Sequence, residues 1–332
     1  MRKVICSIMV TLLMAVGSTA ANAATETVRL HYVPSLYAAP LFVAQEKGFF
    51  EQNGLKVDMK PITAVTESVP LLSSGQIDVA TGGYGAGIFS AIKDGIDIRI
   101  VAPMGVVGQG QRAPNPLLVR KGAGITSIKQ MKGKRVACAG GLVGGSGFQL
   151  IQILETEGVS GNDVILNNLR FPDQVVALTQ GAVDAAMSSE PFATKLIKDG
   201  VAVALAYPKP GTSVTGLLYS GKFMKERPQA AKNFMVALMK GFRDVQGDKF
   251  VSPENLQIFN KYTKVATEIM REVARYDYDP DLVLNTATLL EQQAVYMRYG
   301  ALKYSPPLKP EQFVDETYIK HALSVLGPYK RN

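Results

Sequence analysis

The chain contains an internal repeat whose two copies lie 106 residues apart. The segment LSSGQIDVA at 72–80 is echoed by LTQGAVDAA at 178–186. In each copy an apolar helical stretch, which starts near Val65 or Gln174, ends at a glycine and is followed by a short apolar strand. Glycine readily takes the left-handed conformation that closes a helix. A period this long indicates a duplicated domain, because solenoid repeats span only about 20 to 50 residues.

The similarity between the two halves extends upstream of this segment. In each half an apolar strand leads to a helix that ends at a glycine, and a second strand follows. The strands are predicted at 28–32 and 55–59 in the first half and at 135–139 and 164–169 in the second, with the helices ending at Gly48 and Gly158. Strand, helix, strand, helix, strand in each half predicts two similar α/β lobes with parallel sheets.

Two proline-rich stretches are candidate crossings between the lobes. They are APNP at 113–116 and YPKPG at 207–211. After the second crossing, 216–220 is predicted to be a strand that returns to the first lobe. Amphipathic stretches at 230–242 and 280–299 are predicted to be helices that pack on the first lobe. We therefore expect lobe 1 to comprise 24–116 and 217–332, and lobe 2 to comprise 117–216.

The first 23 residues have the pattern of a secretory signal. Arg2 and Lys3 precede a short apolar stretch, and Ala21-Asn22-Ala23 is a small-x-small site, so we expect cleavage after Ala23 and a periplasmic protein. The apolar stretch at 4–16 has thirteen residues, fewer than the about 20 that a membrane-spanning helix needs. Cys6 lies inside this segment, which leaves Cys138 as the one mature cysteine and excludes an intramolecular disulfide.

Charge and motif content exclude several classes of protein. The formal charge is +8, or +6 without Arg2 and Lys3, and is spread along the chain without a basic run, so no nucleic-acid partner is expected. The chain has two histidines, His31 and His321, and no metal-binding spacing of the H-E-x-x-H or C-x-x-C kind. We expect no metal, no cofactor and no catalytic residues, and therefore not an enzyme.

Glycines follow the first strand of the second half, in the stretch GGLVGGSG at 140–147. In an open α/β sheet, ligands collect beyond the carboxyl ends of the strands, and free backbone N–H groups at a helix start suit an anionic or carbonyl group. We therefore expect Gly144, Ser146 and Gly147 to bind a ligand. The stretch matches neither the dinucleotide fingerprint nor a P-loop, and the alternative is a glycine turn needed only for tight packing.

Other candidate ligand-binding residues lie at the equivalent strand ends. Ser35 and Tyr37 precede the first helix of lobe 1, although Ser35 is equally suited to capping that helix. Tyr84 and Gly85 follow the third strand, and Phe171 lies at an edge of the predicted cleft, so that aromatic rings are expected to contact a planar ligand.

Two polar residues of the second half complete the predicted site. Glu190, immediately before Pro191, is expected to accept hydrogen bonds from a ligand N–H group, the alternative being an ion pair across the hinge. Gln174, at the start of its helix, is a further expected donor.

The order and spacing of several segments resemble the periplasmic solute-binding proteins of the sulfonate, taurine, nitrate and thiamine-pyrimidine uptake systems. These segments are AAPLFVAQEKGFF at 38–50, SGQID at 74–78, MKGKRV at 131–136, Glu190-Pro191 and KERP at 225–228. The resemblance covers nearly the whole mature chain. It implies the two-lobed periplasmic binding protein fold of type II, with two hinge crossings and a C-terminal helical extension on lobe 1.

The resemblance also implies the function. It implies the substrate-binding component of an ABC importer, which captures a small organic solute such as a sulfonate, an aromatic carboxylate or a pyrimidine-like molecule. The implied partners are that solute and an inner-membrane permease with its ATPase, and we expect a monomer. The alternatives are a ligand-binding sensory module and a pyrimidine-related enzyme on the same fold.

Overall fold

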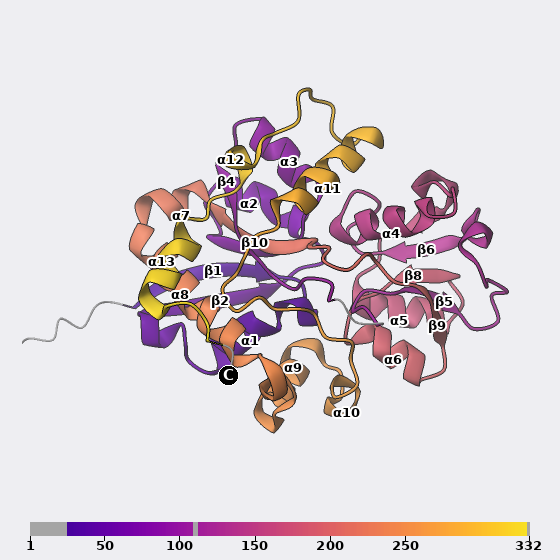
Figure 1. Cartoon of the computed structure of the whole chain (residues 1–332), viewed down its shortest axis with the longest axis horizontal. Helices are drawn as coiled ribbons and strands as arrows, with labels where there is room; N and C mark the ends of the chain where they lie inside the picture. The colour runs from indigo at the N-terminus through magenta and orange to yellow at the C-terminus, as the bar shows by residue number, and fades with distance from the viewer. Residues whose placement is uncertain (1–24, 109–111, 331–332) are drawn as a thin grey trace, which may run out of the picture.

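The structure, a computed structural model, describes residues 25–108 and 112–330. The predicted signal segment, residues 1–23, lies outside the described residues. Two five-stranded sheets lie side by side, each flanked by helices, and form two lobes (Figure 1). Below, lobe 1 denotes residues 25–103 and 215–330, lobe 2 denotes 117–206, and the crossings are the two stretches between them. Among the described residues no helix is long and apolar enough to cross a membrane.

The two sheets have the same strand order when their strands are matched by the repeat. The order is β2-β1-β3-β10-β4 in lobe 1 and β7-β6-β8-β5-β9 in lobe 2. The lobe 1 strands are β1 (Glu26–Tyr32), β2 (Leu55–Pro61), β3 (Val79–Gly83), β4 (Ile98–Pro103) and β10 (Thr215–Ser220). The lobe 2 strands are β5 (Leu117–Arg120), β6 (Arg135–Cys138), β7 (Ile165–Asn167), β8 (Ala185–Met187) and β9 (Ala202–Ala206).

The prediction of purely parallel sheets is wrong for one strand in each lobe. β10 runs antiparallel to β3 and β4, and β5 runs antiparallel to β8 and β9, whereas the remaining pairs within each repeat are parallel. Both exceptions directly follow a crossing. The chain arrives from the other lobe at the edge where the parallel strands end, so it can only run back in the opposite direction. The predicted return of the chain to lobe 1 after the second crossing is confirmed by β10.

Helices cover both faces of each sheet. The helices of the first repeat are α1 (Ala39–Glu46), α2 (Val69–Ser73) and α3 (Ala86–Lys93), and those of lobe 2 are α4 (Gly145–Glu155), α5 (Phe171–Thr179) and α6 (Phe192–Lys198). Gly75 and Gly181 follow α2 and α5 with φ of 68° and 71°, the left-handed conformation that the repeat pattern predicted.

The C-terminal part of the chain is helical and lies on lobe 1. Its helices are α7 (Gly221–Glu226), α8 (Pro228–Asp244), α9 (Pro253–Thr263), α10 (Thr267–Met270), α11 (Thr286–Arg298), α12 (Pro310–Phe313) and α13 (Thr317–Leu326). α1 and α8 bury apolar residues against one face of the lobe 1 sheet, and α3 and α11 against the other. The helix predicted over 280–299 begins only at Thr286, because Leu282 has a φ of 61° and Asn285 caps the helix through its side chain.

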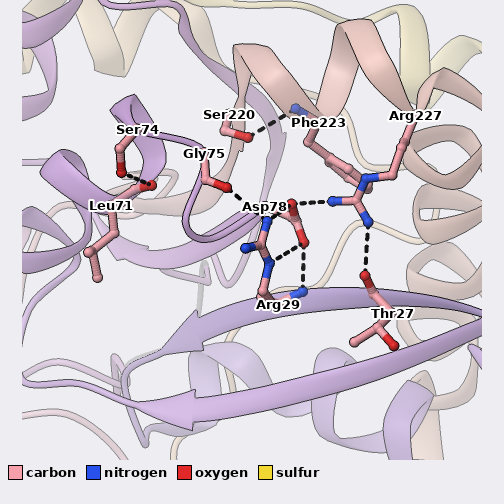
Figure 2. A network of polar contacts seen from close by, with 9 residues as sticks. All are labelled: Thr27, Arg29, Leu71, Ser74, Gly75, Asp78, Ser220, Phe223 and Arg227. Atoms are coloured by element: carbon pink, nitrogen blue, oxygen red, sulfur yellow. Dashed lines mark hydrogen bonds and ion pairs between the residues drawn. The ribbon is translucent and has the colours of Figure 1, made fainter.

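A buried carboxylate joins the two parts of lobe 1. Asp78, whose side chain is 2% exposed, accepts hydrogen bonds from Arg29 on β1 and from Arg227 at the junction of α7 and α8 (Figure 2). Arg227 also donates to the carbonyl of Thr27. Asp78 therefore ties the segment that returns from lobe 2 to the first strand of the chain.

Candidate functional site

A cavity of about 40 Å³ lies between the lobes, where the carboxyl ends of the strands of both sheets meet. Its walls come from both lobes and from the crossings. The residues that line it are Val33, Tyr37, 63–66 and Gly83 from lobe 1, Ala139, Gly140, 144–146, Phe171 and Ser189 from lobe 2, and Asn115, Val214, Thr215 and Tyr276 beside the crossings. A solute of drug size needs about 300 Å³ or more, so it enters this small cavity only if the lobes separate.

The start of α4 forms one wall of the cavity. The N-cap Gly144 has extended backbone, and Gly145 and Ser146 open the helix beside the cavity. The first amide groups of a helix have no acceptor within the helix, so they are available to a ligand. A Cβ atom at Gly145 would lie 2.7 Å from the Val214 carbonyl oxygen and 3.0 Å from Gly83 Cα. The absence of a side chain therefore allows the two lobes to approach at this point.

A chain of buried hydrogen bonds forms another wall. Ser35 Oγ lies 2.7 Å from Ser189 Oγ, which lies 2.6 Å from the hydroxyl of Tyr276. That hydroxyl donates to Asn115 Oδ1, and Asn115 Nδ2 donates to Gln149 Oε1 at 2.9 Å. The chain thus links lobe 1, lobe 2 and the first crossing.

Four of the ten predicted ligand-binding residues line the cavity: Tyr37, Gly144, Ser146 and Phe171. The Tyr37 residue is 3% exposed, and its hydroxyl donates to the Thr81 carbonyl at 3.3 Å. Ser35 does not line the cavity, but its hydroxyl is hydrogen-bonded to that of Ser189, which does. Its side chain makes no capping bond to the following helical turn, so the capping alternative does not hold in this structure.

Three predicted residues serve packing in this structure. Tyr84 is 1% exposed, and its ring occupies the space over Gly216, where a Cβ atom would lie 1.8 Å from the Tyr84 hydroxyl oxygen. Gly147 faces the backbone of the preceding loop, with Leu142 O only 2.2 Å from the position of a Cβ atom. Gly85 caps α3 beside the Val143 carbonyl. All three lie next to the cavity rather than on its walls.

Glu190 and Gln174 are engaged by protein groups. The Glu190 carboxylate accepts hydrogen bonds from the amide and hydroxyl of Thr194, at 3.0 and 2.8 Å, and from the Ala274 amide of lobe 1 at 3.1 Å. Burial raises the pKa of Glu190 to about 7, against the opposing effect of these hydrogen bonds. The sequence analysis gave an ion pair across the hinge as the alternative role of Glu190. In the structure its contact with the other lobe is instead a hydrogen bond from the Ala274 amide. Gln174 donates to the Leu169 carbonyl at 3.1 Å.

The sequence interpretation did not select Asn115, Ser189, Thr215 and Tyr276, which line the cavity. Asn115 stands between two prolines of a predicted crossing, and Ser189 stands at a predicted strand end, so both positions carried a signal. Tyr276 lies in the helical C-terminal part, 87 residues after Ser189, and nothing in its surroundings in the sequence marks it.

Contacts across the lobes continue on both sides of the cavity. The Leu36 amide donates to the Glu190 carbonyl at 3.0 Å, and the Ala86 amide donates to the Val143 carbonyl at 2.9 Å. The hydroxyl of Tyr296 on α11 lies 2.8 Å from the Tyr84 carbonyl oxygen and 2.9 Å from that of Gly144. The C-terminal extension therefore positions the loop before α4, although it packs on lobe 1.

In a comparison with protein families, residues 35–248 match the NMT1/THI5 like family. That range contains most of the residues on the cavity walls. The chain belongs to the NMT1/THI5-like family. The family resemblance read from the sequence is thereby confirmed.

Relatives of this NMT1/THI5-like protein include two bacterial binding proteins. The riboflavin-binding protein RibY of Chloroflexus aurantiacus is 23% identical over 66% of this chain, and the match spans 61% of RibY. A putative aliphatic sulfonates-binding protein of Bacillus subtilis is 24% identical over 86% of this chain and 85% of its own length.

The fold of this NMT1/THI5-like protein matches that of solved binding proteins. The alkanesulfonate-binding protein SsuA of Xanthomonas axonopodis pv. citri, bound to MOPS, superposes with a TM-score of 0.68 and 18% identity, covering 90% of this chain and 98% of SsuA. The two-lobed periplasmic binding protein fold predicted from the sequence is confirmed.

Proposed function

We propose that the protein is the periplasmic substrate-binding component of an ABC importer. It captures a small organic solute between its lobes and delivers it to an inner-membrane permease with its ATPase, acting as a monomer. The observation that carries this proposal is the cavity between the lobes, whose walls come from both lobes and both crossings. A solute held there contacts both lobes, so it stabilises the closed form relative to the open one.

The reactive side chains support binding rather than catalysis. The thiol of Cys138 is fully buried, burial raises its pKa to about 12, and it lies 3.7 Å from the Gly141 carbonyl oxygen. A thiol with so high a pKa is almost entirely protonated at neutral pH and is a poor nucleophile. His31 pairs with the hydroxyl of Ser68 at 2.9 Å, within lobe 1, and is not among the residues that line the cavity.

The ligand classes follow from the relatives and the cavity. The two relatives are named for binding riboflavin and aliphatic sulfonates. The open helix start and the ring of Phe171 suit an anionic or carbonyl group on a planar molecule. A sulfonate, an aromatic carboxylate and a pyrimidine-like molecule are therefore the classes to test.

Thermal unfolding of the purified mature protein against a panel of these compounds tests the proposal. A ligand that binds only the folded state raises the midpoint, equivalent to about 2.7 kcal/mol at a hundred times its dissociation constant. We expect one class to raise the midpoint and the same compound to reduce the radius of gyration in small-angle X-ray scattering. Turnover of any compound in the panel, or a complete lack of binding, contradicts the proposed function.

A further inference from the structure

The chemistry of the cavity walls, given the proposed function, restricts the solute further. Among the residues that the structure describes, none that lines the cavity is an aspartate, glutamate, lysine, arginine or histidine. The excess positive charge of the chain is therefore not placed at the cavity. A fully charged solute buried here would have no side chain of opposite charge, which is costly in a site removed from water.

The hydroxyl protons of Tyr276 and Ser189 are both used within the hydrogen-bonded wall. The Tyr276 hydroxyl gives its one proton to Asn115 Oδ1, so it can only accept from Ser189. Ser189 has then used its own proton, so towards Ser35 it can only accept; the Ser35 hydroxyl also lies 3.2 Å from a second acceptor, the Glu190 carbonyl oxygen. The hydroxyl oxygens of Ser189 and Tyr276 therefore have only lone pairs left to offer the cavity.

The other buried hydroxyls of the cavity are committed in the same way. The Tyr37 hydroxyl donates to the Thr81 carbonyl, and the Thr215 hydroxyl donates to the Gly105 carbonyl at 3.1 Å. Hydrogen-bond donors lie at the start of α4, in the amides of Gly145 and Ser146 and the half-buried Ser146 hydroxyl. The half-buried hydroxyls of Thr63 and Thr66 on lobe 1 also line the cavity. One wall thus accepts hydrogen bonds and another donates them.

The Glu190 carboxyl strengthens this asymmetry. It lies behind the accepting wall and is 2% exposed. Burial raises the pKa of Tyr276, and the negative charge of Glu190 adds to this effect. When ionised it disfavours a second negative charge in the cavity and favours a donor against the wall.

We propose that the solute is compact and uncharged and carries an N–H or O–H donor on one edge and a carbonyl oxygen on another, as an imide, lactam or ureido compound does. The donor faces Ser189 and Tyr276, and the carbonyl oxygen faces the amides of α4. A bare anion such as nitrate or a simple sulfonate has no hydrogen-bond donor. It would leave the hydroxyl oxygens of Ser189 and Tyr276 without a partner.

Matched pairs of compounds test this inference by calorimetric titration of the mature protein. Succinimide and uracil carry the donor and the carbonyl, whereas N-methylsuccinimide and dimethylated uracil lack the donor. We expect at least one donor-bearing compound to bind, and its methylated partner to bind at least tenfold more weakly. The affinity of the donor-bearing compound should not depend on salt concentration, because salt screens interactions between charges and this ligand has none.

Nitrate and methanesulfonate are the opposing arm. If either binds while the four neutral compounds do not, the uncharged class is wrong. If the methylated compounds bind as well as their partners, the required donor is wrong. The receptor function stands in both cases. If none of these compounds and none of the wider panel binds, the proposed function itself fails.

Substitution of the accepting wall adds a readout that does not depend on overall folding. Tyr276→Phe keeps the ring and removes the oxygen that accepts from Ser189, so the affinity for the donor-bearing compound should fall about tenfold while the methylated compound is unaffected. Tyr262→Phe is the control, since that hydroxyl donates to Glu46 at 2.7 Å, outside the cavity. If Tyr276→Phe weakens the affinity for both compounds equally, or does not weaken it, then Tyr276 is not part of a wall that accepts a hydrogen bond from the solute.

Discussion

Arg29 donates three hydrogen bonds to Asp78, and the same arrangement recurs 106 residues later in lobe 2, between Arg135 and Asp184. In each pair the arginine amide and Nε bond one carboxylate oxygen, at 2.8–2.9 and 3.1 Å, and one terminal nitrogen bonds the other oxygen. That nitrogen also donates to the carbonyl of the glycine that closes the preceding helix, Gly75 or Gly181. The pair therefore fixes how β1 meets β3 and how β6 meets β8.

The two copies of this pair differ in burial, so their removal should differ in cost. The side chain of Asp78 is 2% exposed and receives a second arginine, Arg227, whereas that of Asp184 is 17% exposed. Asp78→Asn leaves two arginines facing a neutral group and should lower the free energy of unfolding by on the order of 3 kcal/mol. Asp184→Asn, the matched control, should cost less. Urea unfolding measures both, and an equal or larger loss in Asp184→Asn would show that burial does not decide the difference.

Closure of the lobes depends on the missing side chain at Gly145. Gly145→Ala places a Cβ atom 2.7 Å from the Val214 carbonyl oxygen and 3.0 Å from Gly83 Cα, so the lobes must stay further apart. We expect ligand affinity to fall tenfold or more, with a larger radius of gyration in the presence of ligand. Gly87→Ala is the control, because its Cβ atom would meet only Thr66 at 3.6 Å. Unchanged affinity in Gly145→Ala would contradict the close approach seen here.

The raised pKa of Glu190 predicts a pH dependence of stability. Burial raises this pKa from 4.5 to about 7, so the folded state keeps a proton that the unfolded state releases. The contribution of Glu190 to the free energy of unfolding should therefore fall as the pH rises from about 4.5 to about 7, by on the order of 3 kcal/mol, and stay constant above. Glu190→Gln cannot titrate and should lack this slope. Denaturant unfolding of both proteins between pH 5 and 8 measures the difference, and parallel curves would refute the prediction.

Much of the fold follows from local patterns in the sequence. The apolar strands, the closing glycines and the proline-rich crossings are each recognisable within about ten residues, and the repeat at 72–80 and 178–186 shows that they are used twice. The direction of β5 and β10 was not predictable in this way. It depends on which edge of a sheet the chain enters from, and a strand has the same pattern in either direction.

The strand-end rule located the site but not the orientation of its side chains. It selected Tyr37, Gly144 and Phe171, which line the cavity, and by the same rule Tyr84 and Glu190, which point into protein. Backbone position follows from topology, whereas side-chain direction depends on which neighbours leave room. Tyr84 turns into lobe 1 because Gly216, 132 residues away in the chain, leaves space for its ring.

The sequence by itself determined the duplicated α/β lobes, the crossings and the glycine-rich start of α4, because periodicity and backbone conformation are local properties. The tertiary structure alone decided that Asn115, Ser189 and Tyr276 meet in one wall, within which the hydroxyl protons of Ser189 and Tyr276 are used. These residues come from a crossing, lobe 2 and the C-terminal extension, and only the packing of the folded chain brings such distant segments together. The direction of each hydroxyl proton, and with it the kind of solute the wall can accept, exists only once that packing is complete.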